Sequence, residues 1–280
     1  MRKRSGFAGD RRSMVVEEEK IAEISAKFLS RVMVENGVWK INAEGMHYQE
    51  LNRLLRGLDN NGAEKIEIRN VYGQRYIGTD LEKNMGIDIY GTPGNDLGAF
   101  MNGPRLVVHG NAQDCCGNTM NDGQIVIHGH AGDITGYAMR GGKIFIRDDV
   151  GYRTGIHMKA YRNKKPYLVV GGTAQDFLGE YMAGGVLVVL GLTLKAEERH
   201  RARFVGTGMH GGIIYVRGEI THLGKEVKVM GVNKSDLNLI QSLVKEFCGY
   251  FNTDFDEIMR GKFSKIVPFS HRPYGSVYAY

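Results

Sequence analysis

Residues 129–146 read Gly129-His-Ala-Gly132-Asp-Ile-Thr-Gly136-Tyr-Ala-Met139-Arg-Gly-Gly142-Lys-Ile144-Phe-Ile146. Their pattern recurs in register on both sides and is the strongest indication of the fold. It reads as a glycine-rich turn, a methionine, a glycine pair and a short apolar run. The glycines of six units are Gly98, Gly117, Gly136, Gly155, Gly179 and Gly206, each followed three residues later by a methionine, namely Met101, Met120, Met139, Met158, Met182 and Met209. A short unit at near-constant spacing predicts a solenoid, whose stacked neighbours bury a shared core.

The apolar runs of the repeat predict strands. Ile125-Val-Ile127, Ile144-Phe-Ile146 and Leu187-Val-Val189 are short and rich in β-branched residues, which favours strands over helices. One strand per repeat cannot form hairpins, but it can coil so that equivalent strands pair in parallel ~4.8 Å apart. The expected fold class is mainly β: a single-stranded, right-handed parallel β-helix (solenoid) over residues 71–220, with the six methionines stacked inside. A leucine-rich repeat would need several leucines per unit and an asparagine ladder, which are absent.

The N-terminal part, residues 1–70, is expected to hold a tail and a small α/β cap. A helix is predicted over residues 47–58, whose leucines fall on one helical face. Lys65-Ile-Glu-Ile-Arg69 alternates as a strand does. We expect the two elements to close one end of the solenoid, because an open end would expose unpaired backbone.

The C-terminal part, residues 221–280, is expected to hold a helix and an extended tail at the other end of the solenoid. Ser235 is the predicted N-cap of a helix that runs to about residue 248. Its apolar face would carry Leu239, Ile240, Leu243, Val244 and Phe247. Residues 263–275 are rich in proline and aromatic residues and are expected to extend along the protein itself or along a partner.

Composition favours a cytoplasmic protein that binds neither membrane nor nucleic acid. The longest uncharged apolar stretch, Met182 to Leu194, is too short to span a bilayer, and the basic start lacks an apolar signal region. The net charge is +6, and much of the excess lies in a basic tail before residue 13, with no aromatic-basic module beside it. Three cysteines without a Cys-x-x-Cys pair fit a reducing compartment.

Two motifs resemble catalytic or cofactor signatures, and in both a structural role is the better interpretation. Gly206-Thr-Gly208-Met-His-Gly211 matches the dinucleotide fingerprint, but a strand follows it, whereas the fingerprint needs a helix. Cys115 and Cys116 lie in the turn before Gly117, and the sequence offers neither of them a base. The spacing of the cysteines also matches no iron–sulfur pattern.

Histidines and aspartates also recur at repeat positions. His109 and His128 are equivalent in successive coils, and we expect them to stack on the surface rather than bind a metal, because no third ligand is evident. Asp114, Asp133 and Asp176 recur in the turns, where aspartates accept bonds from backbone N–H groups. We expect a column of turn-capping aspartates rather than a catalytic carboxylate pair.

The glycine pattern resembles the GXGXG domain. Gly91/Gly94/Gly98 and Gly129/Gly132/Gly136 match its core, and the stretch 179–191 is similar to the version in the glutamate synthase large subunit. The resemblance covers roughly residues 70–220. It implies the β-helix that ends the glutamate synthase large subunit, which carries no catalytic residue. That domain braces the glutaminase domain against the FMN domain and lies beside the ammonia tunnel. The same family includes a scaffold subunit of formylmethanofuran dehydrogenase.

The resemblance implies a non-catalytic structural subunit of a glutamate-synthase-type complex, which makes glutamate from glutamine and 2-oxoglutarate. The expected partners are a glutaminase chain and an FMN-containing synthase chain; FMN and an iron–sulfur cluster would lie on partners, and this chain would bind no cofactor or metal. Self-association stays open. The alternatives are the scaffold subunit of a formylmethanofuran-dehydrogenase-like molybdenum or tungsten enzyme, and an independent solenoid binding protein. The last would need an exposed aromatic row, and few aromatic residues recur at one repeat position.

The residues expected to contact partners lie in one turn and two charged loops. The longer repeat intervals carry the loops 159–165 and 195–203, which must leave the coil, and insertions in solenoids commonly gather on one binding face. The candidates are Glu180 and Tyr181 in the turn, Lys164 and Lys165 in the first loop, and Arg199 and Arg201 in the second. No catalytic, cofactor-binding or metal-binding residue is assigned.

Overall fold

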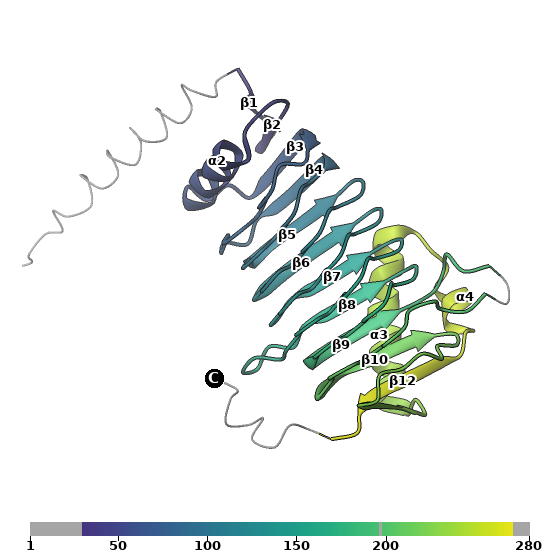
Figure 1. Ribbon diagram of the computed structural model, residues 1–280. Helices are drawn as coiled ribbons and strands as arrows, with labels where there is room; N and C mark the ends of the chain where they lie inside the picture. The colour runs from purple at the N-terminus through teal and green to yellow at the C-terminus, as the bar shows by residue number, and fades with distance from the viewer. Residues whose placement is uncertain (1–29, 196–197, 271–280) are drawn as a thin grey trace, which may run out of the picture.

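The protein is a parallel β-solenoid in which each coil contributes one strand (Figure 1). The computed structural model describes residues 30–195 and 198–270. Its strands are β1 (Val32–Glu35), β2 (Val38–Asn42), β3 (Lys65–Tyr72), β4 (Gly86–Thr92), β5 (Asn102–Val108), β6 (Asp122–Ile127), β7 (Lys143–Ile146), β8 (Tyr167–Val170), β9 (Ala183–Val189), β10 (Gly211–Arg217), β11 (Val227–Met230) and β12 (Phe263–Pro268). Its helices are α2 (Tyr48–Asn60), α3 (Lys234–Phe251) and α4 (Phe255–Met259).

The strands of the coils stack in parallel and in register, as the repeat predicts. From β2 to β10 each strand pairs with the next in chain order, and Ile125, Ile144 and Leu168 are direct neighbours in this ladder. All three are fully buried. Because side chains alternate between the two faces of a strand, the position before each of these residues points outward. The outward positions of the coils therefore also form columns.

The methionine column inside the solenoid is confirmed. Met101, Met120, Met139, Met158, Met182 and Met209 are all buried, none more than 2% exposed. The glycine three residues earlier has a positive φ and packs against an aliphatic side chain of the following coil. At Gly136, φ is +75°, and a methyl group added there would lie 2.6 Å from Leu168 Cδ1. Glycine recurs at this place because both the backbone and the space exclude a side chain.

The turns that carry these glycines are hydrogen-bonded to the coils on both sides. Every second residue of each turn has a positive φ. The backbone N–H groups of successive positive-φ residues therefore point alternately to the next coil and to the preceding coil. In one turn, Ile134 and Ala138 donate to Tyr152 and Ile156 of the next coil, while Gly136 donates back to Cys116 of the preceding coil. The corner is therefore held as firmly as a strand, which keeps any side chains on it in fixed positions.

The N-terminal end is closed by more structure than the sequence predicts. Helix α2 buries Leu51, Leu54, Leu55 and Leu58, as expected, and β3 contains the predicted strand. The antiparallel pair β1–β2 was not expected; it adds two strands beyond β3, with β1 at the edge of the sheet.

The C-terminal segment differs from expectation in two ways. The N-cap of α3 is Asn233 rather than Ser235, because Asn233 Oδ1 accepts from the Asp236 backbone N–H, and Asp236 bonds back in a capping box. Helix α3 also does not close the end of the solenoid. It lies along the outer face of the later strands, where Val244 and Phe247 pack with Phe145 and other outward residues (Figure 1).

The end of the solenoid is closed by two antiparallel strands instead. The segment expected to be an extended tail forms β12, which pairs with β10 on one side and β11 on the other. The tail thus packs on the protein itself as far as residue 270, and the rest of the predicted tail lies outside the described residues.

Candidate functional site

The two charged loops leave the coil at opposite ends of the strands, so the expectation of one binding face is wrong for them. Loop 159–165 precedes β8, whereas loop 195–203 follows β9. The turn with Glu180 and Tyr181 belongs to the glycine corner described above. The six predicted contact residues therefore fall into three separate groups, each at a different surface of the described part of the chain.

The first surface is a cluster of rings on the glycine corner, which we call the aromatic corner; its members are Tyr137, His157, Phe177, Tyr181 and Phe204. His157 stacks on Tyr181 with ring centres 5.2 Å apart and planes 13° apart, and Tyr137 meets His157 edge-on at 6.0 Å. Phe177 and Phe204 stack at 5.0 Å. Tyr137, Tyr181 and Phe204 are 37%, 45% and 48% exposed. Large exposed rings held in place are typical of protein interaction surfaces.

Glu180 lies beneath this surface rather than on it. Its side chain is only 10% exposed, and the carboxylate accepts a 2.9 Å bond from Arg153 Nε. The Arg153 guanidinium also lies 5.2 Å from the centre of the Phe177 ring. Glu180 and Arg153 thus join the two ring stacks, so Glu180 positions the aromatic corner while Tyr181 is available for contact. The Tyr181 ring occupies the space where Gly208 would carry a side chain.

Sequence reasoning missed the aromatic corner because its rings do not share one repeat position. Tyr137 follows its turn glycine directly, His157 and Tyr181 come two residues after theirs, and Phe177 and Phe204 come two residues before theirs. These positions meet only when the turn folds with alternating positive φ. The signal in the sequence is the gathering of aromatic residues over several turn positions taken together, not their recurrence at one position.

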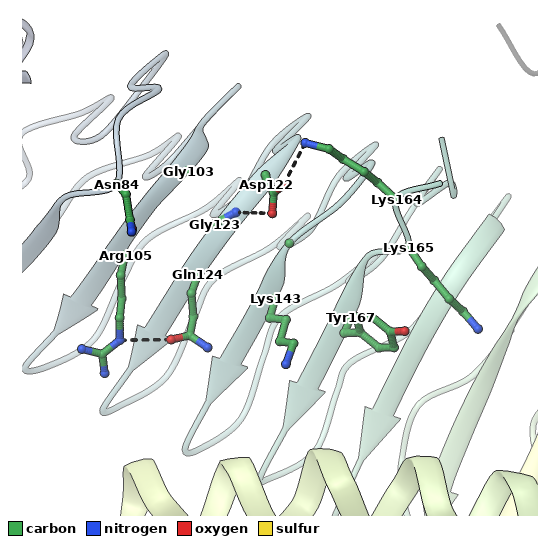
Figure 2. Close-up of a pocket in the computed structure, with 11 residues that line it drawn as sticks. Asn84, Gly103, Arg105, Asp122, Gly123, Gln124, Lys143, Lys164, Lys165 and Tyr167 are labelled. Atoms are coloured by element: carbon green, nitrogen blue, oxygen red, sulfur yellow. Dashed lines mark hydrogen bonds and ion pairs between the residues drawn. The ribbon is translucent and has the colours of Figure 1, made fainter. Parts of the chain in front are cut away.

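The second surface is a groove of about 440 Å³ at the start of the strands, which we call the basic groove (Figure 2). One wall is a column of outward residues from successive coils: Arg105, Gln124, Lys143 and Tyr167. The opposite wall carries the predicted contact residues Lys164 and Lys165, and the groove is completed by Asn84, Gly103, Asp122, Gly123 and Gly142.

Hydrogen bonds and ion pairs hold most of the basic groove in place. Lys164 Nζ lies 2.8 Å from Asp122 Oδ2 and 3.1 Å from Asn102 Oδ1, which ties the loop to the coils below it. Burial opposes the charged form of Asp122, but the hydrogen bond and charge of Lys164 and the backbone N–H of Gly123 together outweigh burial and lower the pKa of that carboxyl. Lys143 pairs with Glu246 of α3 at 2.6 Å. Helix α3 therefore borders the groove (Figure 2).

The third surface carries Arg199 and Arg201. Arg199 pairs with Glu219 at 3.0 Å, and Arg201 pairs with Glu198. Arg201 and Glu198 also line a small polar cleft with Asp149 and Thr193. Both arginines are exposed, and the charge of each is neutralised by the glutamate with which it pairs. This surface therefore offers a less distinct site than the other two.

The cysteines and histidines behave as structural residues. Burial raises the pKa of both Cys115 and Cys116, and nearby aspartates raise it further, so neither thiol is poised as a nucleophile. Tyr90, His109 and His128 stack with ring centres 4.3 and 5.5 Å apart, and His109 bonds Asp88 at 2.9 Å. Across residues 30–195 and 198–270 no group of three or more His, Cys, Asp or Glu residues could hold a metal ion.

The predicted column of turn aspartates is confirmed, and each carboxylate bonds to the following coil. Asp114, Asp133 and Asp176 accept bonds of 2.9 Å from the backbone N–H groups of Asp133, Tyr152 and Arg203, respectively. These side chains extend the backbone ladder across the corner. They are not a carboxylate pair for acid–base chemistry.

By its geometry the protein is a parallel β-solenoid with a side-chain-filled interior and two distinct outer surfaces. Residues 62–269 match the family model described as GXGXG motif, so the chain belongs to the GXGXG family, which includes the C-terminal domain of glutamate synthase. A protein of Methanocaldococcus jannaschii, described as uncharacterized protein MJ1350, is 49% identical over 248 residues, covering 85% of this chain and 95% of the relative.

The described helices do not meet the requirements of a membrane span. None of those between residues 30 and 270, leaving aside residues 196–197, combines the length and the apolar character that a bilayer crossing needs.

Proposed function

We propose that this protein is a non-catalytic structural subunit of a glutamate-synthase-type complex. In such a complex, ammonia released from glutamine reaches a flavin site on another chain and is used to convert 2-oxoglutarate into glutamate. This subunit would brace the glutaminase chain and the FMN-containing chain and flank the ammonia path between them. FMN and the iron–sulfur cluster would belong to the partners. Family membership supports this role.

The observation that carries the proposal is the aromatic corner. Tyr137, Tyr181 and Phe204 expose large rings on a corner whose backbone is bonded to both neighbouring coils. Such rings lose little side-chain entropy on binding, and aromatic residues are enriched in the centres of interfaces. A rigid solenoid that presents them suits a bracing role, because a partner docks against a surface that needs no reordering.

The test is affinity isolation of the full-length tagged protein from its native host, with an absorbance spectrum and mass spectrometry of the eluate. We expect a yellow, iron-containing eluate that holds a glutaminase chain and an FMN-type synthase chain. The variant Tyr181→Ser/Phe204→Ser should lose these partners. Tyr72→Ser removes an exposed ring far from the corner and should keep them.

Two results would contradict the proposal. Co-elution of a pterin-binding chain would place the protein in a molybdenum or tungsten enzyme instead. Elution alone and colourless at low salt would favour an independent solenoid binding protein, for which the aromatic corner would be the ligand surface. Circular dichroism of each variant checks that a lost partner does not reflect a lost fold.

A further inference from the structure

The basic groove contains more positive charge than its own carboxylates neutralise. Lys164 pairs with Asp122, and Lys143 pairs with Glu246. Arg105 donates to the neutral amide of Gln124 at 3.0 Å, and its guanidinium lies 5.5 Å from the Tyr250 ring centre. Neither Arg105 nor Lys165 pairs with a carboxylate in the described part of the chain. The groove is thus left with two cations that lack a counter-charge.

Neutral hydrogen-bonding groups lie between these cations. Gln124, Tyr167 and Asn84 face the same groove (Figure 2). Arg105, Gln124, Lys143 and Tyr167 occupy the same register position in four successive coils, so they form a row with a spacing of ~4.8 Å. Gln124 Nε2 and Lys143 Nζ already donate to Glu246, at 2.9 and 2.6 Å, so the donors that this row leaves for a ligand are the Arg105 guanidinium and the Tyr167 hydroxyl. Together with Lys165 on the opposite wall, they can bind an anion with several oxygen atoms.

Glycines line part of the groove. A methyl group at Gly103 would lie 2.5 Å from Glu82 O, and one at Gly142 would lie 2.6 Å from Met120 Cε. Close packing of the coils therefore requires glycine there, and it leaves bare backbone between the two charged walls. The resulting volume of about 440 Å³ falls in the range of sites for small molecules.

We infer that the basic groove binds a phosphate-bearing small molecule of the nucleoside diphosphate class. A diphosphate supplies enough negative charge for the two unpaired cations, and the planar fork of Arg105 matches phosphate oxygens. The groove is larger than a single phosphate or a small dicarboxylate fills, and the Tyr167 ring at one end can contact an apolar or aromatic part. This inference does not depend on the proposed role in a complex.

The test is isothermal titration of the full-length protein with ADP, and with pyrophosphate, adenosine and 2-oxoglutarate in parallel. We expect one ADP per chain, weaker binding at higher salt, measurable binding of pyrophosphate and none of adenosine. Arg105→Gln and Lys165→Gln should each weaken ADP binding about tenfold, the loss of one charge-assisted hydrogen bond. Both side chains are exposed, so the fold should persist, and the melting temperature checks this.

Lys225→Gln is the matched control, because it removes one charge from an exposed position outside the groove. It should bind ADP like the wild type. The inference is overturned if ADP does not bind at millimolar concentration, or if Lys225→Gln weakens binding as much as the groove variants do. Tighter binding of 2-oxoglutarate than of ADP would also overturn it, in favour of a dicarboxylate site.

Discussion

Gly136 shows most directly how single residues build this fold. Its φ of +75° belongs to the left-handed region, and Leu168 fills the space beside it. We expect Gly136→Ala to lower the free energy of unfolding by about 2 kcal/mol, from backbone strain and crowding together. Urea unfolding followed by circular dichroism measures this.

The control for that change lies in α3. Gly249 has open space around it and no positive φ, so Gly249→Ala should stabilise the protein slightly, by about 0.5–1 kcal/mol. Equal destabilisation by both variants would show that the repeat glycine is not required by the turn.

Asp236 is the residue whose charge state should affect stability most clearly. Burial opposes its charged form, but hydrogen bonds from Lys265, Tyr215 and the Asn233 backbone N–H, together with the charge of Lys265, outweigh burial and lower its pKa. The stability that its charged form contributes is therefore present above the ordinary aspartate pKa of about 4 and is lost as the pH falls through the lower, folded-state value.

The variant Asp236→Asn tests this dependence on pH. The unfolding midpoints of wild type and variant should differ by a constant amount at neutral pH and converge in acid. Lys234→Gln, an exposed change on the same helix, should leave the profile of the wild type intact. A difference that stays constant down to acid pH would show that the carboxylate contributes nothing through its charge.

Residues inside the repeat were predictable, whereas the cap of α3 was not. The methionine column and the aspartate ladder follow from a period that places equal residues one above another. Asn233 and Ser235 are both good N-caps, and the choice depends on Asp236, which completes a capping box only with Asn233. The spacing of Asn233 and Asp236 was available in the sequence and was the better guide.

At the scale of elements, α3 stabilises the outer face of the sheet. Phe247 is fully buried, and its ring lies against Gly171. Phe247→Ala should cost about 3–5 kcal/mol, the usual range for a large aromatic removed from a core. Thermal unfolding checks the value.

An exposed position on the same helix is the control, because it shows whether the loss at Phe247 comes from packing or from a change in helix propensity. Leu237 is exposed, so Leu237→Ala should change stability by no more than about 0.5 kcal/mol. Comparable losses at both positions would mean that α3 is not anchored by its apolar face.

The strands outside the repeat were missed because they lack its pattern. β1 and β2 are short and antiparallel, and β12 ends in Pro268, within a stretch whose proline and aromatic content indicates an extended tail. Their position depends on long-range pairing with β3, β10 and β11 rather than on local periodicity. The stacked coils, by contrast, follow from neighbours close in the chain.

At the scale of the molecule, the solenoid is a rigid body with different chemistry on its corner and at the start of its strands. Lys165 and Tyr181 are exposed and Lys164 is half-buried, and the surfaces to which they belong emerge only when separate coils are stacked. Their expected contact with partners stays a prediction. Arg105 and Phe204 are distant from these residues in sequence and could be assigned to the same surfaces only from the structure.

We propose that this chain braces a glutaminase chain against an FMN-containing chain, so that glutamine-dependent glutamate formation depends on it. The most direct measurement is glutamate formation by the isolated complex with and without this protein, supplied either with glutamine or with ammonium salt. We expect removal of the chain to abolish the glutamine-dependent reaction. Adding back Tyr181→Ser/Phe204→Ser should restore far less activity than adding back the wild type. Equal glutamine-dependent rates with and without the chain would contradict it.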